Sequence, residues 1–396
     1  MKKKTKIKLI ILILIVFVSL FLYFSGIYND LKIKAINYFE NTLEKKGLEL
    51  IEGSGSLIDA SKISGLKDSG ITGEGYSFSF VDNPYYKILD DANDQKLYAQ
   101  IYANIDKVEK SFKPVVNINK DSINDVVEAV FDDHPELFYV NTSYSYKYIE
   151  GGKVVQITLS YNSTAKNLDA SKTKFNNKVN EIIAGANKYS TNYEKEKYVH
   201  DTLININTYD ESEKLNQSAY SALITGRTVC AGYSRAFQLI LNKMGITTYY
   251  ITGDSSGDHA WNVVELDGDL YNVDVTWDDQ EKISYRYFDV PDSVFSKTHI
   301  RKGLSIYISA CRGTKYYNLE EKNTTTTNKR VVEDTTTKKE EEIIVPSNEK
   351  EEEQDEIDNT NNNESTDDKD TFNRFYNYYR DYYNQYDNID NNYSDE

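Results

Sequence analysis

The pair Asp267-Gly268 limits the fold of this chain more than any other feature, because it stands between two largely apolar runs. Asp-Gly in that setting is a strong signal for a two-residue β-hairpin turn. Residues 259–266 and 269–275 are therefore expected to be antiparallel strands, with Leu266 facing Asp269 across the turn.

The register of this hairpin decides which polar side chains can meet. Counting back from the turn places His259 opposite Thr276, with Asp274 as its diagonal neighbour on the same face. Diagonal neighbours lie about 7–8 Å apart at the backbone, a span that a His–Asp hydrogen bond can bridge. A slip of one residue would turn Asp274 to the opposite face, so the expected contact depends on the turn.

A helix is expected upstream of the hairpin, over residues 230–244. Its apolar residues recur close to helical spacing, and Gly245 follows as a stop signal. Cys230 then lies in the first turn, where the partial positive charge of the helix end favours a thiolate. A buried strand is expected next, at residues 247–252.

Cys230, His259 and Asp274 together have the chemistry of a nucleophilic triad. The thiolate attacks a carbonyl, the imidazole moves the proton, and the carboxylate orients the imidazole and stabilises its charged form. The amide of Cys230 is a natural oxyanion donor. A second donor is expected from Gln217 or Tyr220, between which the sequence does not choose. This chemistry requires the three groups to meet at a pocket open to solvent.

Three blocks around these residues resemble the signature blocks of bacterial transglutaminase-like proteins. They are VCAGYS at 229–234, HAWN at 259–262 and YNVDVTWD at 271–278. Upstream, His200-Asp201 followed by NTYD at 207–210 is similar to the helix that precedes the catalytic block in that family. The segment DHPELFY at 133–139 resembles one found ahead of the core in membrane-attached relatives. The resemblance is strong over roughly residues 170–290.

This resemblance implies an α+β fold with a papain-like core, in which the nucleophile helix packs on an antiparallel sheet. It also implies a catalytic triad at Cys230, His259 and Asp274. Many relatives carry Gln where this chain has Ala231, a difference that leaves the triad intact and is expected to affect only the cleft. The resemblance leaves the reaction open, since transamidases, deamidases, peptidases and inactive members share this core.

The N-terminal end predicts export. Met1–Lys8 is basic and Leu9–Ile27 is mostly apolar. These 19 residues span about 28 Å as a helix, close to the thickness of a bilayer core. The lysines should remain in the cytoplasm, which places the rest outside the membrane. A cleaved signal peptide is the alternative, but the length of the run and the lack of a clear cleavage site favour an uncleaved anchor.

The net charge of -17 is concentrated at the C-terminal end. Residues 321–396 contain 22 acidic and 9 basic residues and so contribute -13, whereas the rest contributes only -4. The remainder has no basic patch, so nucleic acid is not an expected partner. Low apolar content predicts that the tail is disordered. Aromatic residues recur at three- and four-residue steps over 372–386, so a docking helix there is the alternative.

Between these ends, helices are expected at 94–112, from Asp121, at 169–188 and at 193–206, and strands at 137–140, 143–149 and 153–161. The expected parts of the chain are a transmembrane signal-anchor (1–27), a stalk or spacer (28–92), a small α+β module (93–165), a transglutaminase-like catalytic domain (166–318) and a disordered acidic, Tyr-rich tail (319–396).

Other motifs favour structural roles. GDSSG at 253–257 matches the serine-hydrolase elbow, but that elbow requires a helix after the serine and a strand is expected there. His134 and His200 are expected to brace the fold, and Trp261 either packs in the core or lines the cleft. The histidines are scattered and no metal-ligand motif is present, so neither a metal nor a cofactor is expected.

Cys230 also has an alternative structural role, because an exported chain with two cysteines could pair it with Cys311 in a disulfide. Such a bond would leave the helix start, the histidine and the aspartate without a purpose. Cys311 is therefore expected to be packed and idle.

The sequence thus predicts a membrane-anchored, extracytoplasmic cysteine enzyme that acts on amide bonds of proteins or peptides through a thioester at Cys230. Transamidation, deamidation and peptide hydrolysis all fit, and cell-envelope proteins are the expected substrates. The alternative is a non-catalytic envelope module that uses the same fold to bind protein or glycan.

Overall fold

Two four-stranded sheets frame the residues that the computed structural model describes, 48–76 and 79–320. No helix within these residues is both long enough and apolar enough to cross a membrane. The predicted anchor at 1–27 and the predicted tail beyond residue 320 lie outside the described residues. The described fold is α+β, as expected.

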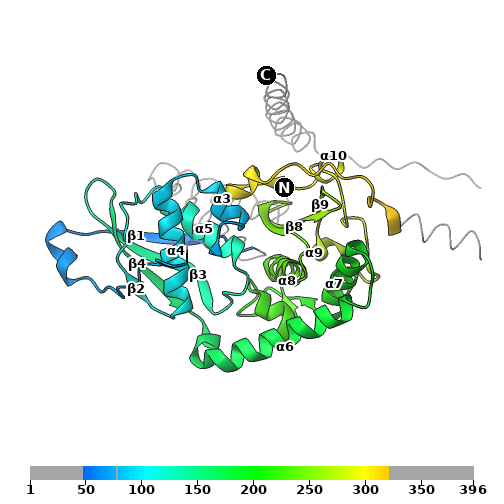
Figure 1. Cartoon of the computed structure of the whole chain (residues 1–396), viewed down its shortest axis with the longest axis horizontal. Helices are drawn as coiled ribbons and strands as arrows, with labels where there is room; N and C mark the ends of the chain where they lie inside the picture. The colour runs from blue at the N-terminus through cyan, green and yellow to red at the C-terminus, as the bar shows by residue number, and fades with distance from the viewer. Residues whose placement is uncertain (1–47, 77–78, 321–396) are drawn as a thin grey trace, which may run out of the picture. The chain divides into compact units, whose positions relative to one another are not determined.

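The N-terminal sheet has the strand order β1-β3-β4-β2. Its strands are β1 (Glu52–Leu57), β2 (Ser111–Phe112), β3 (Val140–Tyr148) and β4 (Val154–Tyr161). β1 runs parallel to β3, while the other pairs are antiparallel. The helices α4 (Ala92–Asp106) and α5 (Ile123–Asp133) lie over this sheet in Figure 1.

Two expectations for this region are corrected in detail. The helix predicted at 94–112 ends at Asp106, because the buried Phe112 belongs instead to edge strand β2. The predicted strand at 137–140 is a turn that leads into β3, in which the Leu137 amide donates to the His134 carbonyl at 3.0 Å.

Residues 48–92 are not a spacer, which corrects a third expectation. They provide β1, a 3-10 turn η1 (Ala60–Gly65) and the short helix α3 (Pro84–Ile88). Tyr85 is fully buried, and its hydroxyl donates to the Tyr250 carbonyl on the other sheet. This buried contact ties the segment to the rest of the fold, although its polar composition had suggested an unstructured spacer.

The C-terminal sheet carries the hairpin. Its order is β10-β7-β8-β9, with β7 (Thr248–Asp254), β8 (Asp258–Leu266), β9 (Asp269–Val273) and β10 (Ile300–Arg301). Leu266 pairs with Asp269, so the predicted register is confirmed. The second strand is shorter than predicted, because Asp274 leaves the sheet to cap the short helix α9 (Val275–Asp278).

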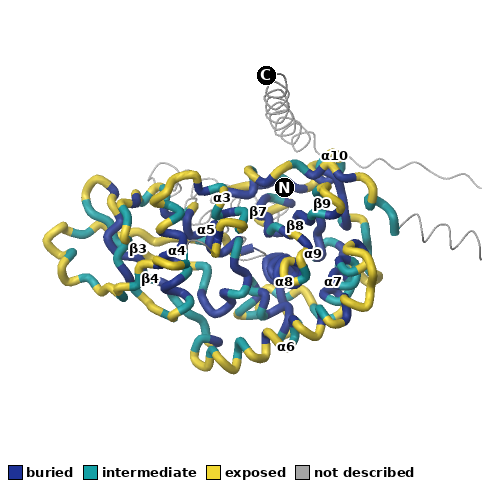
Figure 2. The backbone as a smooth tube through the Cα atoms, viewed as in Figure 1, coloured by how far each residue is buried: buried dark blue, intermediate teal, exposed yellow. Residues whose placement is uncertain are grey.

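The helix α8 (Cys230–Lys243) is the centre of this half, with α6 (Leu168–Ala186) and α7 (Asn192–Ile206) on its other side (Figure 1). α8 is buried along most of its length, whereas α6 shows an exposed outer face (Figure 2). The remaining elements are short: η3 (Ser163–Asn167), β5 (Thr208–Tyr209), η4 (Ser221–Thr225), β6 (Arg227–Thr228), α10 (Asp292–Phe295) and η5 (Gly303–Tyr307).

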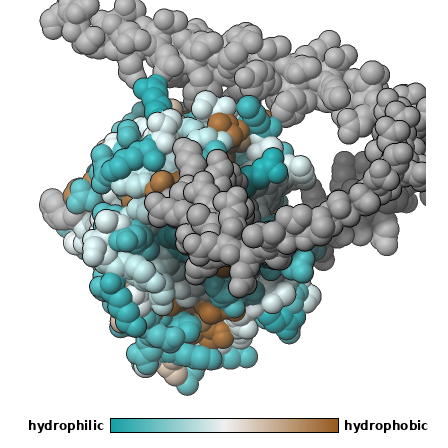
Figure 3. Space-filling model, turned by 90° about the vertical axis from the view of Figure 1, so that its right-hand side faces the viewer, coloured by the Kyte–Doolittle hydropathy of each residue, from teal (hydrophilic) through white to brown (hydrophobic). Residues whose placement is uncertain are grey.

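Side chains of α8 join the two halves. Arg235 donates to the Phe131 carbonyl at 2.9 Å, and Gln238 donates to the Asp132 carbonyl at 2.7 Å. Both acceptors lie in α5, so α8 of the C-terminal half is hydrogen-bonded to the N-terminal half. Where the described residues are visible in Figure 3, apolar residues form only small patches on a mostly hydrophilic face.

Candidate active site

Cys230 is the first residue of α8, and Val229 before it is extended. The chain is held at this point by the Asn216 carbonyl, which accepts from the Thr228 hydroxyl at 2.8 Å and the Val229 amide at 3.4 Å. The amide of Cys230 has no acceptor within the helix, because the first four N–H groups of any helix lack one. The helix start therefore presents a donor and a partial positive charge beside the sulfur.

Gly232 allows this close approach. A Cβ on Gly232 would lie 1.8 Å from the Thr228 hydroxyl and 2.8 Å from the Asn216 carbonyl. Any side chain at this position would push the helix away from the segment that anchors it. The glycine of the VCAGYS block is thus explained by packing.

The strand that carries His259 is fastened to the nucleophile helix. The Asn262 amide group donates to the Ser234 carbonyl at 3.0 Å and to the Tyr249 carbonyl at 3.1 Å. In the other direction, the Ser234 hydroxyl donates to the Ala260 carbonyl at 3.1 Å. These bonds keep β8 in a set position against α8, so the residues of the HAWN and VCAGYS blocks hold one another.

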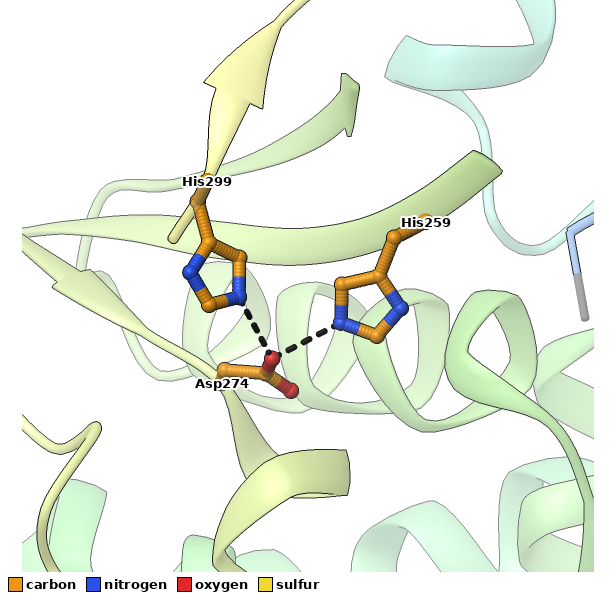
Figure 4. Close-up of side chains that lie close together, drawn as sticks. All are labelled: His259, Asp274 and His299. Atoms are coloured by element: carbon orange, nitrogen blue, oxygen red, sulfur yellow. Dashed lines mark hydrogen bonds and ion pairs between the residues drawn. The ribbon is translucent and has the colours of Figure 1, made fainter. Parts of the chain in front are cut away.

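Asp274 completes the arrangement. Its Oδ2 lies 2.7 Å from Nε2 of His259 (Figure 4). Its Oδ1 accepts from the amides of Thr276 and Trp277 at 3.0 and 3.1 Å. The same carboxylate therefore caps α9 through one oxygen and holds the imidazole through the other. These two sets of bonds fix the orientation of the carboxylate.

The charges of the site support an ion pair. Burial by itself would lower the pKa of His259, but the Asp274 carboxylate and a hydrogen bond with Cys230 outweigh it and raise the pKa to about 10. Burial likewise opposes ionisation of Asp274, but the neighbouring His259 and His299 hold its pKa below the usual range. The site thus favours a charged imidazole between a carboxylate and the sulfur.

His299 was missed by the sequence reasoning. Its Nε2 lies 3.1 Å from the same Oδ2 of Asp274 (Figure 4). The ring is fully buried, stacks on Phe295 at 4.0 Å between centroids and packs against Trp277 at 4.6 Å. Burial lowers its pKa, so it remains a neutral donor to Asp274 near pH 7. It stands 25 residues after Asp274 with no motif around it, so the sequence offered no signal.

His259, Asp274 and His299 also have the composition of a small metal site. One potential ligand atom from each lies within 4.8 Å of the others. The scattered histidines of the sequence gave no reason to expect such a group, which the fold alone assembles. In this structure the same atoms are joined by hydrogen bonds of 2.7 and 3.1 Å, the arrangement that a proton-transfer site requires.

The three other predicted site residues differ in position. Gln217 accepts from the Glu49 amide at 2.9 Å and lines a cavity with Ser218 and Arg235. Tyr220 stacks on Phe138 at 4.8 Å, in the aromatic packing between the two halves. The Nε2 of Gln217 donates to Asn216 at 3.1 Å, and neither this contact nor the Tyr220 stacking involves the triad, so the choice of the second oxyanion donor stays open.

Trp261 is a core residue rather than part of a cleft wall. It is 1% exposed, and its ring packs against Phe295 and His299 at 5.8 and 5.1 Å. We expect Trp261→Ala to lower the free energy of unfolding by about 3–5 kcal/mol, because it empties a large buried volume. Urea unfolding followed by far-ultraviolet circular dichroism measures this.

Tyr307→Ala is the matched control, since Tyr307 is 63% exposed. It should change the free energy of unfolding by less than about 0.5 kcal/mol. Equal effects of the two substitutions would contradict the core assignment of Trp261.

The expectation of an open pocket is only half met. The three groups converge, but Cys230 is fully buried. It belongs to a small apolar cluster whose other members are Leu48, Val229, Ala231, Tyr250 and Ala260. Leu48 comes from the segment that precedes β1.

Both cysteines are free, which excludes the Cys230–Cys311 disulfide in this structure. Cys311 is buried beside Arg301, whose Nη2 lies 3.2 Å from its sulfur. Burial raises the pKa of Cys311, so its thiol remains protonated and unreactive.

The other motifs have structural positions. His200 is buried and bonds Asp201 at 2.9 Å, with Asp278 at 3.4 Å on its other nitrogen. These contacts fit the bracing role predicted for His200. The GDSSG stretch joins β7 directly to β8, so no helix follows its serine.

Comparisons with known proteins point to the same region. Residues 177–275 match the model of the transglutaminase-like superfamily. No curated protein matches the sequence.

Solved structures with a similar arrangement include a TGase, with 16% identity, covering 42% of this chain and 50% of that one at a TM-score of 0.24. Another is a candidate cysteine protease of Cytophaga hutchinsonii, with 15% identity, covering 38% and 55% at a TM-score of 0.26. The chain thus spans about half the length of these two structures. A candidate protease of Parabacteroides distasonis has 12% identity, covering 31% and 28% at a TM-score of 0.21.

Proposed function

We propose that this protein is a cysteine enzyme that acts on amide bonds of proteins or peptides through a thioester at Cys230. The observation that carries the proposal is the 2.7 Å contact of Asp274 with His259, beside Cys230 at the first residue of α8, whose thiol helps to raise the pKa of His259. The superfamily match over residues 177–275 supports it.

Each group has a defined part in the reaction. The Cys230 thiolate adds to the amide carbonyl, and the Cys230 amide stabilises the oxyanion. The His259 imidazolium gives its proton to the leaving amine, and a thioester remains on the sulfur. Water or a primary amine then attacks the thioester and gives its proton to His259, and the thiolate is restored. Asp274 keeps the imidazole oriented and stabilises its charge throughout.

The acceptor and the location are part of the proposal. Water as acceptor gives deamidation or peptide hydrolysis, and an amine gives transamidation. We place the enzyme outside the cytoplasm, anchored by the apolar run at 9–27 with the basic Met1–Lys8 inside. Proteins or peptides of the cell envelope would then be its substrates.

Mass spectrometry of the full-length protein tests the chemistry. Incubation with glutamine-containing peptides should give a peptide adduct on Cys230 that lacks the elements of ammonia, and a primary amine should release it as the substituted amide. Peptide binding without any adduct, ammonia release or peptide cleavage would contradict the proposal.

That contrary result would favour a non-catalytic binding module. One observation speaks for this alternative, namely that Cys230 is fully buried in the structure.

A substitution at His299 tests whether its hydrogen bond to the Asp274 carboxylate contributes to catalysis. His299→Leu removes one donor from Asp274, and hydrogen bonds to charged groups contribute about 1.5–3 kcal/mol. We therefore expect kcat to fall by about 10–100-fold. His299→Gln, which retains an N–H donor, should recover part of the loss. Steady-state kinetics measures both, and equal losses in the two variants would show that His299 acts only through packing.

A further inference from the structure

The segment at residues 48–57 follows one path from the nucleophile to the edge of the N-terminal sheet. At its beginning, Leu48 is 6% exposed and belongs to the apolar cluster around Cys230. Here it shares a buried cluster with the residue that must meet the substrate.

The next residue contacts Gln217, one of the two candidate oxyanion donors. The backbone N–H of Glu49 donates to Oε1 of Gln217 at 2.9 Å. Glu49 also lines the cavity that contains Gln217 and Arg235 and extends to Ser143 at the start of the paired part of β3. Glu49 therefore joins the segment to this cavity, at the point between Leu48 in the Cys230 cluster and the strand that follows.

The segment then becomes strand β1. It pairs in parallel with β3, from Glu52 opposite Ser143 to Leu57 opposite Tyr148. All six residues of β1 are exposed, so the strand contributes nothing to the buried core. Backbone pairing holds this strand at the sheet edge, and the Ser56 hydroxyl also donates to the Tyr146 carbonyl at 3.5 Å. Addition of a strand to a sheet edge is the arrangement by which many domains bind extended peptides.

Glycines in β1 match tyrosines in β3. A Cβ on Gly53 would lie 2.5 Å from the Tyr144 ring, and one on Gly55 would lie 2.7 Å from the Tyr146 ring. The two tyrosine rings stand side by side, 6.1 Å between centroids. A Cβ at either position would therefore overlap the outer end of a tyrosine ring unless that ring moved.

We propose that residues 48–57 occupy the groove that takes the substrate, and that the substrate is an extended polypeptide with alternating glycines. This rests on the proposed function and names its substrate class. With the reactive residue in the place of Leu48, the glycines stand five and seven positions further along the chain, where Tyr144 and Tyr146 receive them. The segment must leave the groove before Cys230 can react, so it acts as a built-in competitor.

Alkylation of Cys230 in the full-length protein tests the occupancy without requiring turnover. Leu48→Gly, and separately Gly53→Val with Gly55→Val, should raise the rate of iodoacetamide labelling at Cys230 by about tenfold or more, since local opening becomes easier. Leu50→Gly and Gly65→Val are the matched controls. Leu50 is 47% exposed, and a Cβ on Gly65 would meet nothing within 4 Å. Leu48→Gly and the Gly53→Val, Gly55→Val double variant are called the released variants. If the wild type is labelled at Cys230 as fast as both of them, the proposal is overturned.

Cys311 serves as the internal standard, because it is buried away from the segment. Its labelling should stay slow in every variant, which shows that the core remains folded. If Cys311 labelling rises together with that of Cys230 in one variant, that variant has lost its folded core. The other variant and the added peptide then test the occupancy of the groove.

A synthetic peptide of residues 48–57 tests the groove directly. Added to the Gly53→Val, Gly55→Val protein, it should slow Cys230 labelling, whereas the same peptide with valine at both glycine positions should not. Equal effects of the two peptides, or none from either, would overturn the proposal.

The substrate class has its own readout. The released variant should form the Cys230 adduct faster with a glutamine peptide that carries glycines five and seven positions later than with its valine counterpart. If labelling rises in the released variants but no adduct forms with any peptide, the proposed chemistry fails while the occupancy stands.

Discussion

Cys230→Ala is expected to reduce turnover of amide substrates by about a million-fold, the order of loss found when a covalent nucleophile is removed. A thioester requires a thiol, and the other cysteine, Cys311, contacts Arg301 instead of the site. The mass adduct should disappear completely. Ammonia release and intact-mass measurement check both outcomes.

Cys311→Ala is the matched control, since Cys311 is the other buried cysteine and contacts Arg301 rather than the triad. It should retain turnover and adduct formation. Turnover in Cys230→Ala above a thousandth of the wild-type rate would contradict the thioester mechanism, because water and the oxyanion donors alone cannot supply it; residual catalysis after loss of a nucleophile is of the order 10³–10⁴ over the uncatalysed reaction.

Asp274→Asn should lower kcat by about 10⁴-fold, because an amide cannot stabilise the imidazolium and holds the wrong tautomer. The pH dependence should change as well. The carboxylate helps to raise the pKa of His259 to about 10, so the charged imidazole persists well above neutrality in the wild type. The alkaline limb of kcat/KM should therefore lie near pH 10 in the wild type and move toward neutral pH in the variant.

The same linkage predicts a change in stability. The folded-state pKa of His259 is raised above its ordinary value of about 6.5, so its contribution is fully present below that pH and is lost as pH rises toward 10. Urea unfolding between pH 6 and 10 should show this decline in the wild type and a flatter profile in Asp274→Asn.

Asp278→Asn is the control for these pH effects. Asp278 is equally buried but contacts His200, so its loss should leave the alkaline limb of activity in place. An alkaline limb that does not move in Asp274→Asn would show that His259 owes its raised pKa to another group.

The local elements could be predicted because short-range signals agreed there. Asp267-Gly268 defined the hairpin, and Gly245 ended the helix that begins at Cys230. Even so, the strand β9 ends at Val273, two residues earlier than expected. Asp274 can either continue a strand or cap a helix, and only its bonds to the two following amides and to His259 decide between them.

The contacts that could not be predicted join distant residues with no shared motif. His299 reaches Asp274 only because β10 pairs with β7 at the edge of the sheet. Residues 48–57 looked like a polar spacer, since glycine and serine form poor cores. They are ordered by backbone pairing with β3 and by contact with Tyr144 and Tyr146. These tyrosines lie about 90 residues further along the chain, so no local sequence pattern links them to the segment.

The sequence by itself predicted that His259 and Asp274 meet, because turn chemistry and the period of a strand fix the register of the hairpin, and their 2.7 Å contact confirms this. Only the tertiary structure decided what surrounds this pair: a second histidine on the carboxylate, and Leu48 in the apolar cluster of Cys230. Such contacts depend on how whole elements pack, and packing is set by the sum of many weak apolar contacts that no local pattern records.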